Sequence, residues 1–386
     1  MINMSTANIY IHIPFCEKKC NYCDFTSFPL NNKELYEKYS QLIGKELTLK
    51  RDSFIWNKIQ NIYFGGGTPS LFKASLIENI LNSIKEQYEI IENSEITLEV
   101  NPGTVTFNDL KAYKDIGINR ISLGIQSLND NYLNFLGRIH NSQEALISIE
   151  NSLKLFDNVT VDLIWGLPEQ RTENIEDDLN ILTSFPIKHI STYNLTLEKS
   201  VPLYNDMIKG KFKLPTDIYQ EKIYFFIHDY LSAKDFIHYE ISNFGKKNYL
   251  SNHNQDYWKR KPYLGLGVSA HGYDSNSESR TINDSNLNNY INNIENNNLP
   301  IINIEHLNKE DIITEEIWLP LRTSRGLKRE RLLNYFSKEK IENFEKDFTA
   351  IYSDNLLEIT DNNWKIPYKN WYKMESVIIK IIEMLL

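Results

Sequence analysis

Short apolar runs alternate with longer amphipathic stretches from residue 9 to about residue 196. The runs are rich in Ile, Val and Tyr, which is typical of buried strands, and each adjoins a stretch with helical periodicity. Repeated strand-then-helix units form a parallel sheet covered by helices, and six of them suit an open or partial barrel. The strands are expected at residues 9–14, 59–67, 95–100, 120–125, 159–166 and 189–195, with helices such as 32–50 and 74–88 between them.

The rhythm changes beyond residue 197. A long amphipathic stretch at residues 216–236 leads into an aromatic-rich segment. Residues 283–310 are so rich in asparagine that we expect them to link or cap their neighbours. From about residue 308 three helical patterns follow, together with an apolar pair of segments at 356–368 whose "DNN" turn predicts a hairpin.

The whole pattern predicts an α/β fold. It consists of a partial (β/α)6 barrel and a C-terminal, mostly helical, winged-helix-like module. We expect three parts, a core barrel at residues 1–200, a barrel-completing segment at 201–300 and the C-terminal module at 301–386.

The composition is that of a globular protein, with 41% hydrophobic and 24% charged residues. The formal charge of −9, from 51 acidic and 42 basic residues, argues against nucleic acid as a partner, because nucleic acid favours a basic surface. No apolar run approaches the roughly 18 residues that span a bilayer. The first ten residues lack the basic and apolar regions of a secretory signal, so the expected location is the cytoplasm.

The three cysteines of the chain, Cys16, Cys20 and Cys23, lie together in "YIHIPFCEKKCNYCDF". The odd number disfavours a disulfide framework, and C-x3-C-x2-C directly after a strand indicates a loop that brings three thiolates to one inorganic centre. A four-iron cluster normally takes four cysteines, so this site would leave one iron open to a small molecule. The alternative is a structural zinc site completed by His12 or Asp24, although closed zinc sites favour two pairs of ligands.

Polar residues and glycines gather where the predicted strands end. They are Gly65 to Thr68, Glu99, Gln126 and Asp162. In barrels of this type the carboxyl ends of the strands build the site. Either acid alone would be interpreted as part of a capped loop or a surface ion pair, so it is their shared location that indicates a binding site.

The cysteine segment is similar to the signature of the radical S-adenosylmethionine (radical SAM) superfamily. Together with "YFGGGTPS", "LEVNPGT", "SLGIQSLND", "LGRIH" and "VDLIWGLPEQ" it resembles the HemN/HemW branch, in order and over nearly the entire chain. The resemblance implies a radical SAM barrel in which Cys16, Cys20 and Cys23 hold a [4Fe-4S] cluster. In that family the amino and carboxylate groups of S-adenosylmethionine (SAM) chelate the open iron.

The resemblance also implies which residues contact SAM. The glycine-rich turn matches the segment that holds the methionine amino group, and Arg138 suits the carboxylate by bidentate pairing. Glu99 and Asp162 suit the hydroxyls or the ammonium, whereas Tyr10 and Tyr22 match SAM-contacting positions that packed aromatics could equally occupy. The implied SAM residues are Tyr10, Tyr22, Gly66, Gly67, Thr68, Glu99, Gln126, Arg138 and Asp162.

The segment "HNQDYW", residues 253–258, resembles the H-N-x-x-Y-W motif of the HemW family, whose members are heme chaperones. Histidine is a standard axial ligand of heme iron, so the resemblance implies that His253 binds heme beside Tyr257 and Trp258. The alternative is a structural histidine in an aromatic-rich turn. His271 in "SAHGY" is a weaker second candidate, near the SAM pocket.

Two functions are consistent with the resemblance. One is a heme chaperone that keeps the cluster and SAM and transfers heme to acceptor proteins, membrane-bound respiratory enzymes among them. The other is an oxygen-independent coproporphyrinogen III oxidase, a radical SAM decarboxylase of porphyrin biosynthesis. The oxidase branch has a longer N-terminal arm and a further cysteine where this chain has Phe25, so we expect the chaperone. Cleavage of SAM, assembly as a homodimer and docking on a membrane are left open.

Overall fold

The computed structural model describes residues 6–352 and 355–386. Its centre is a curved sheet in which the first six strands run parallel, each beside the next in sequence order. The first and fourth of these strands are almost continuously buried, which is expected where helices cover a parallel sheet. The predicted partial barrel is confirmed. The strands are β1 (Ala7–Ile13), β2 (Lys58–Gly66), β3 (Glu89–Val100), β4 (Arg120–Gln126), β5 (Asn158–Trp165) and β6 (His189–Asn194).

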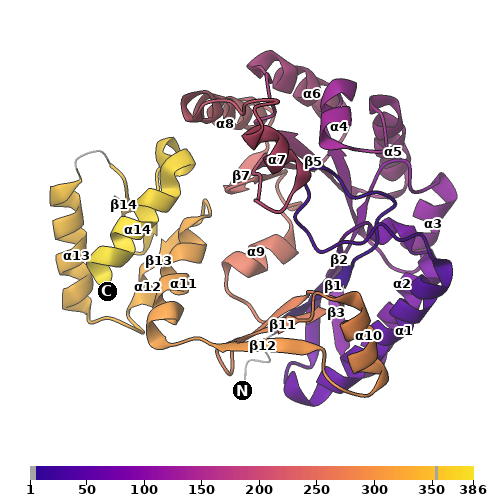
Figure 1. The fold of residues 1–386 in the computed structure, drawn as a ribbon. Coiled ribbons are helices and arrows are strands. Elements are labelled where there is room, and N and C mark those ends of the chain that lie inside the picture. Colours follow the sequence, from indigo (N-terminus) through magenta and orange to yellow (C-terminus); the bar gives the residue numbers. More distant parts are fainter. Residues whose placement is uncertain (1–5, 353–354) are drawn as a thin grey trace.

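Helices follow the parallel strands and most of them lie on the outer side of the curved sheet (Figure 1), whereas α7 (Pro202–Ile208) lies beside the cysteine loop, where the Leu203 N–H donates to the Asn21 carbonyl (3.1 Å). The first of them begins at Asn32, whose side chain accepts a hydrogen bond from the Leu35 N–H and so satisfies a free donor of the first turn. These helices are α1 (Lys33–Lys50), α2 (Ala74–Gln87), α3 (Phe107–Asp115), α4 (Asp130–Leu136), α5 (Ser142–Leu155), α6 (Thr172–Ser184), α7 (Pro202–Ile208) and α8 (Asp217–Ser232).

Six further strands extend the same sheet at both ends. They are β7 (Ile237–Glu240), β8 (Asn243–Gly245), β9 (Tyr263–Leu266), β10 (His271–Asp274), β11 (Ser279–Asn283) and β12 (Ile301–His306). The spatial order is β12-β11-β10-β9-β1-β2-β3-β4-β5-β6-β8-β7, so the barrel stays open. The short helix α9 (Asn252–Trp258) lies between the barrel and the C-terminal module (Figure 1).

The asparagine-rich segment 283–310 does more than link or cap its neighbours, contrary to the prediction. It forms α10 (Leu287–Glu295), which packs on α1, and β12, an edge of the sheet. The Tyr290 hydroxyl donates to the buried Glu46 carboxylate (2.6 Å), and the fully buried Asn283 side chain bridges Glu46 and Lys50. Apolar residues at helical spacing lie among the asparagines. This periodicity, and not the asparagine content, indicates the structure of the segment.

The C-terminal module combines four helices with a small antiparallel sheet. The predicted hairpin at 356–368 is confirmed by β14 (Glu358–Ile359) and β15 (Asn363–Lys365), which β13 (Leu327–Lys328) joins. Trp364 of this sheet is fully buried against Phe344. The helices are α11 (Lys309–Leu321), α12 (Arg329–Leu332), α13 (Lys338–Ile351) and α14 (Met374–Leu385).

Strands from both sides of residue 200 share one sheet, and the helical module follows β12. The predicted boundaries at residues 200 and 300 stay predictions. Throughout residues 6–352 and 355–386, no helix has both the length and the apolar character needed to cross a bilayer.

Candidate functional site

The loop after β1 carries the three cysteines. Cys16 is buried, whereas Cys20 and Cys23 are partly exposed. Backbone hydrogen bonds fix this loop, since the Cys16 N–H donates to the Phe28 carbonyl and the Asn21 N–H to the Leu136 carbonyl (both 3.0 Å). The three cysteines line one cavity of about 390 Å³, a volume within the range of small-molecule sites.

The geometry disfavours the zinc alternative. Both ring nitrogens of His12 are engaged, Nε2 with the Thr26 carbonyl (2.7 Å) and Nδ1 with the Tyr10 hydroxyl (3.0 Å). Among the residues with described positions, no three Cys, His, Asp or Glu side chains are grouped as one metal ion would require. A single zinc ion, with bonds near 2.3 Å, needs a tighter group of ligands than a cluster in which each iron takes one thiolate.

Two of the thiols, Cys16 and Cys23, lie in a setting that favours their protonated form until metal binds. Burial raises the pKa of Cys16, and it raises the pKa of Cys23 to about 11, because a thiolate loses its hydration there. Arg138 supplies positive charge beside them, since its Nη1 donates to the Cys20 sulfur at 3.4 Å. Loading of iron would therefore release protons.

The glycine-rich turn at the end of β2 packs against the cysteine loop. A Cβ atom on Gly67 would lie 2.7 Å from the Phe15 carbonyl oxygen and 3.0 Å from the Cys16 sulfur, so only glycine allows this approach. Gly66 has a φ of +116°, which also favours glycine. The Thr68 hydroxyl donates to the Cys16 sulfur (3.5 Å). The turn thus forms the cavity wall beside the first thiol.

Two carboxyl groups line the cavity, Glu99 from β3 and Asp162 from β5, with β4 between these strands. Glu99 accepts from the Tyr63 hydroxyl (2.8 Å) and the Gly66 N–H (3.2 Å), and Asp162 accepts from the Ser122 hydroxyl (3.0 Å). Burial raises the pKa of Glu99 to about 7, although these donors oppose the shift. Burial also raises the pKa of Asp162. A positively charged ligand in the cavity would therefore lower the pKa of both carboxyls and favour their ionised form.

The raised pKa of Glu99 predicts a pH-dependent stability. Between its ordinary pKa of 4.5 and about 7 the folded chain binds more protons than the unfolded chain, so the stabilisation is present below pH 4.5 and is lost as the pH rises through about 7. We expect Glu99→Gln to reduce this pH-dependent fall in the free energy of unfolding by roughly 2–3 kcal/mol. The lower end of that range applies because the carboxyl faces a cavity open to water. Urea unfolding of SAM-free protein between about pH 5 and pH 8 measures it.

The control for this prediction is Glu92→Gln, an exposed glutamate on the same strand. Its free energy of unfolding should follow the wild type at every pH. An equal decline in the wild type and in Glu99→Gln would show that this carboxyl does not titrate as the structure implies.

Arg138 is held by hydrogen bonds in a position from which it can bind an anion in the cavity. Its Nη2 donates to the Asn101 side-chain oxygen (2.7 Å) and to the Gly124 carbonyl (2.8 Å). Its Nε is buried and has no hydrogen-bond partner within the described residues. A buried donor without a partner is costly, so a carboxylate in the cavity would satisfy it.

Tyr22 and Gln126 also line the cavity, as predicted from the resemblance. Gln126 has a φ of +69°, an uncommon value for a residue with a side chain. Such strain is typical of functional sites, where the surroundings hold the residue in place.

Tyr10 and His253 do not line this cavity but pack behind Tyr63, which does, and contact of Tyr10 with SAM stays a prediction. The His253 ring stacks on Tyr63 with centroids 4.6 Å apart, and Tyr10 stacks behind both rings. Only 3% of His253 is exposed, and its Nε2 is engaged by the Tyr257 hydroxyl (3.0 Å). His271 is exposed on β10 and does not line the cavity.

Two buried carboxylates hold α9 in this position. Glu95 accepts from the backbone N–H groups of Asn252 and His253 (both 3.2 Å), and Asp256 accepts from the side chains of Asn8 and Asn61. These partners lie more than 150 residues away in the sequence, so the motif alone did not predict that its histidine is buried.

Several cavity residues were missed by the sequence analysis. Asn101 connects the glycine-rich turn to Arg138, because its side-chain amide donates to the Thr68 hydroxyl and its side-chain oxygen accepts from Arg138. It follows directly on the strand that carries Glu99, so its place at a strand end was the available signal. The others include Tyr63, Ser122, Tyr193 and Asn194.

Three thiols on the loop after β1 of an open parallel barrel, with polar residues at the strand ends, define a radical SAM protein. The family model described as "Radical SAM superfamily" matches residues 10–182. The structure of "Coproporphyrinogen III oxidase (HemN) from Escherichia coli" covers 98% of this chain and 90% of its own, with a TM-score of 0.81. At 18% sequence identity that likeness shows the fold alone.

Curated relatives carry the assignment further. "Heme chaperone HemW" of Lactococcus lactis is 33% identical over 363 residues, which cover 94% of this chain and 90% of the relative. The protein of the same name from Haemophilus influenzae is 40% identical over 281 residues, or 70% of this chain and 71% of the relative. The chain belongs to the HemW family of the radical SAM superfamily.

Proposed function

We propose that this protein binds heme and passes it to acceptor hemoproteins, and that it carries a [4Fe-4S] cluster with SAM. The observation that carries the proposal is its likeness to proteins named heme chaperones over 94% of the chain. Respiratory hemoproteins are the proposed acceptors, and the cytoplasm, or its membrane surface, is the proposed place of transfer.

The cavity supports the cofactor part of the proposal. Cys16, Cys20 and Cys23 would hold the cluster, which supplies an iron with a free coordination position when bound. Arg138 would bind the SAM carboxylate through its unpaired Nε. Glu99 and Asp162 would accept hydrogen bonds from the SAM hydroxyls or ammonium.

Phe25 argues against the oxidase alternative. Where the oxidase branch has its further cysteine, this exposed phenyl ring (68%) lines the cavity and offers no thiol. In reduced, cluster-loaded protein the oxidase would form 5′-deoxyadenosine from SAM, and protoporphyrinogen and CO2 from coproporphyrinogen. We expect no protoporphyrinogen in that assay.

His253 remains the proposed heme ligand, but it must first become accessible. Burial lowers the pKa of its ring to about 3, so the imidazole is neutral, which is the form that ligates iron. Its Nδ1 has no hydrogen-bond partner among the described residues, whereas Nε2 is held by Tyr257. Ligation therefore requires α9 to move or Tyr257 to release the ring.

Hemin titration tests this proposal. We expect His253→Ala to weaken hemin binding at least about tenfold, a loss of roughly 1.4 kcal/mol. Tyr257→Phe, which frees Nε2, should bind hemin at least as tightly as the wild type. His271→Ala is the matched histidine control and should behave as the wild type. Unchanged affinity in His253→Ala would reject the ligand assignment, and a wild type that binds no hemin would reject the proposed function.

A further inference from the structure

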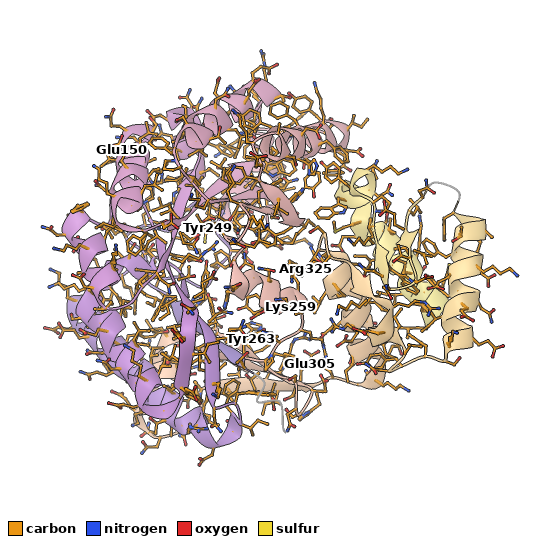
Figure 2. All side chains as sticks on the ribbon, turned by 180° about the vertical axis from the view of Figure 1, so that it is seen from behind. Glu150, Tyr249, Lys259, Tyr263, Glu305 and Arg325 are labelled. Atoms are coloured by element: carbon orange, nitrogen blue, oxygen red, sulfur yellow. The ribbon has the colours of Figure 1, made fainter. Side chains whose placement is uncertain are left out.

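A second cavity, which the site above does not use, lies between α9 and the C-terminal module. Its volume is about 440 Å³. Trp258 and Lys259, at the end of α9, line one side, and Arg325, Arg331 and Lys365 line the other. Lys259 and Arg325 lie in the space between these two parts in Figure 2.

Contacts between β7 and the segment after α11 hold the C-terminal side of this basic cavity in place. The Ser324 N–H donates to the Tyr239 carbonyl (3.0 Å), and a β-bridge pairs Glu240 with Thr323. The lining residues are scattered between positions 239 and 365, so no local sequence pattern predicts this cavity.

The lining is strongly basic in a chain whose net charge is −9. Lys259, Arg325, Lys328, Arg331 and Lys365 line the cavity, and none of its twelve lining residues is acidic. Low-dielectric walls that carry one sign of charge concentrate the field and raise the local concentration of an oppositely charged ligand. The cavity therefore favours an anion.

Three of these cations already have carboxylate partners and two do not. Lys259 pairs with Asp256 (3.0 Å), Arg331 with Glu316, and Lys328 with Glu330 (3.2 Å). Arg325 and Lys365 make no ion pair within the part of the chain that the structure describes, although Glu358 is the strand neighbour of Lys365. Two charges are thus free for a ligand.

An aromatic side chain lines the same cavity as the two free cations. Trp258 lines the cavity, and the Arg322 guanidinium lies 5.2 Å from its ring centroid. Arg322 is itself paired with Glu375 (3.1 Å), so it is not a third free charge. Pro320 and the buried Tyr239 add to the apolar part of the wall. A ligand with a flat apolar body and carboxylates at one edge fits both features.

We propose that this basic cavity binds the carboxylate edge of a planar, apolar dicarboxylate, with Arg325 and Lys365 on the carboxylates and Trp258 against the ring system. The inference rests on the proposed function, under which that ligand is a porphyrin with its two propionates. His253 lies five residues before Trp258 on α9. Its ring stacks on Tyr63 of the barrel and does not line this cavity. The cavity would therefore hold the porphyrin through its propionates, and ligation of the iron by His253 would still require the movement of α9 or the release by Tyr257 described above.

The test compares metal-free protoporphyrin IX with its dimethyl ester on the full-length protein. The double variant Arg325→Gln, Lys365→Gln should bind the free acid about tenfold or more weakly, since each lost charged contact can contribute about that factor. The ester should bind the wild type weakly and the double variant equally weakly.

Lys111→Gln, Lys154→Gln is the matched control, since it removes two exposed lysines from α3 and α5 on the barrel. It should bind the free acid as the wild type does. Equal affinity in the Arg325, Lys365 variant would overturn the inference while leaving heme binding intact. Loss of only an acceptor-protein complex, with porphyrin binding retained, would also overturn it and assign the cavity to an acidic protein partner.

Discussion

Replacing Cys20 or Cys23 by alanine is expected to abolish the iron–sulfur cluster. The chain contains only three cysteines, and all of them line one cavity. A cluster that already lacks a fourth protein thiolate has no substitute for a lost one, because His12 is engaged at both ring nitrogens. Iron and sulfide analysis after anaerobic reconstitution, together with the visible absorption spectrum, measures the loss.

These two positions are preferred to Cys16 because both are partly exposed, so their loss should leave the fold intact. Phe25→Ala is the matched control in the same loop, and it should retain the full iron and sulfide content. A complete spectrum in either cysteine variant would contradict the assignment of the thiols as ligands.

Replacing Arg138 by alanine is expected to weaken SAM binding about 100-fold. Its unpaired Nε can donate to a ligand carboxylate, and its Nη2 holds Asn101 in place beside Thr68. A charge-assisted hydrogen bond contributes roughly 1.5–3 kcal/mol, so loss of the paired contact and of its support reaches that factor. Calorimetric titration of SAM into reconstituted protein measures it.

Arg138→Lys is the informative comparison. Lysine keeps the charge but loses the planar fork, so intermediate affinity is expected if bidentate pairing matters. The iron content of each variant must be measured as well, because Arg138 also donates to the Cys20 sulfur. Tight SAM binding by cluster-loaded Arg138→Ala would exclude the carboxylate role.

The sequence predicted the parts of the site that depend on local pattern. Strand ends, the cysteine spacing and the glycine turn are short-range features, and parallel strands necessarily bring their carboxyl ends to one edge of the sheet. Gly67, Glu99 and Asp162 therefore line the predicted cavity although they lie on three different strand ends.

The parts that could not be predicted depend on distant contacts. His253 is buried because Glu95 and Asp256 hold α9 against the barrel, a consequence of pairings far apart in sequence. Arg325 and Lys365 meet Lys259 only because the C-terminal module packs beside α9. A charge pattern along the chain gives no sign of such a cavity, since the bases are scattered among more numerous acids.

The response of the reduced cluster to SAM tests the central claim most directly. Wild-type protein, reconstituted and reduced without oxygen, should contain iron and sulfide and should change its electron paramagnetic resonance spectrum when SAM is added, because under the proposed function SAM would take the free position on one iron. A spectrum that SAM leaves unchanged, or a preparation that holds only zinc at these thiols, would contradict the account.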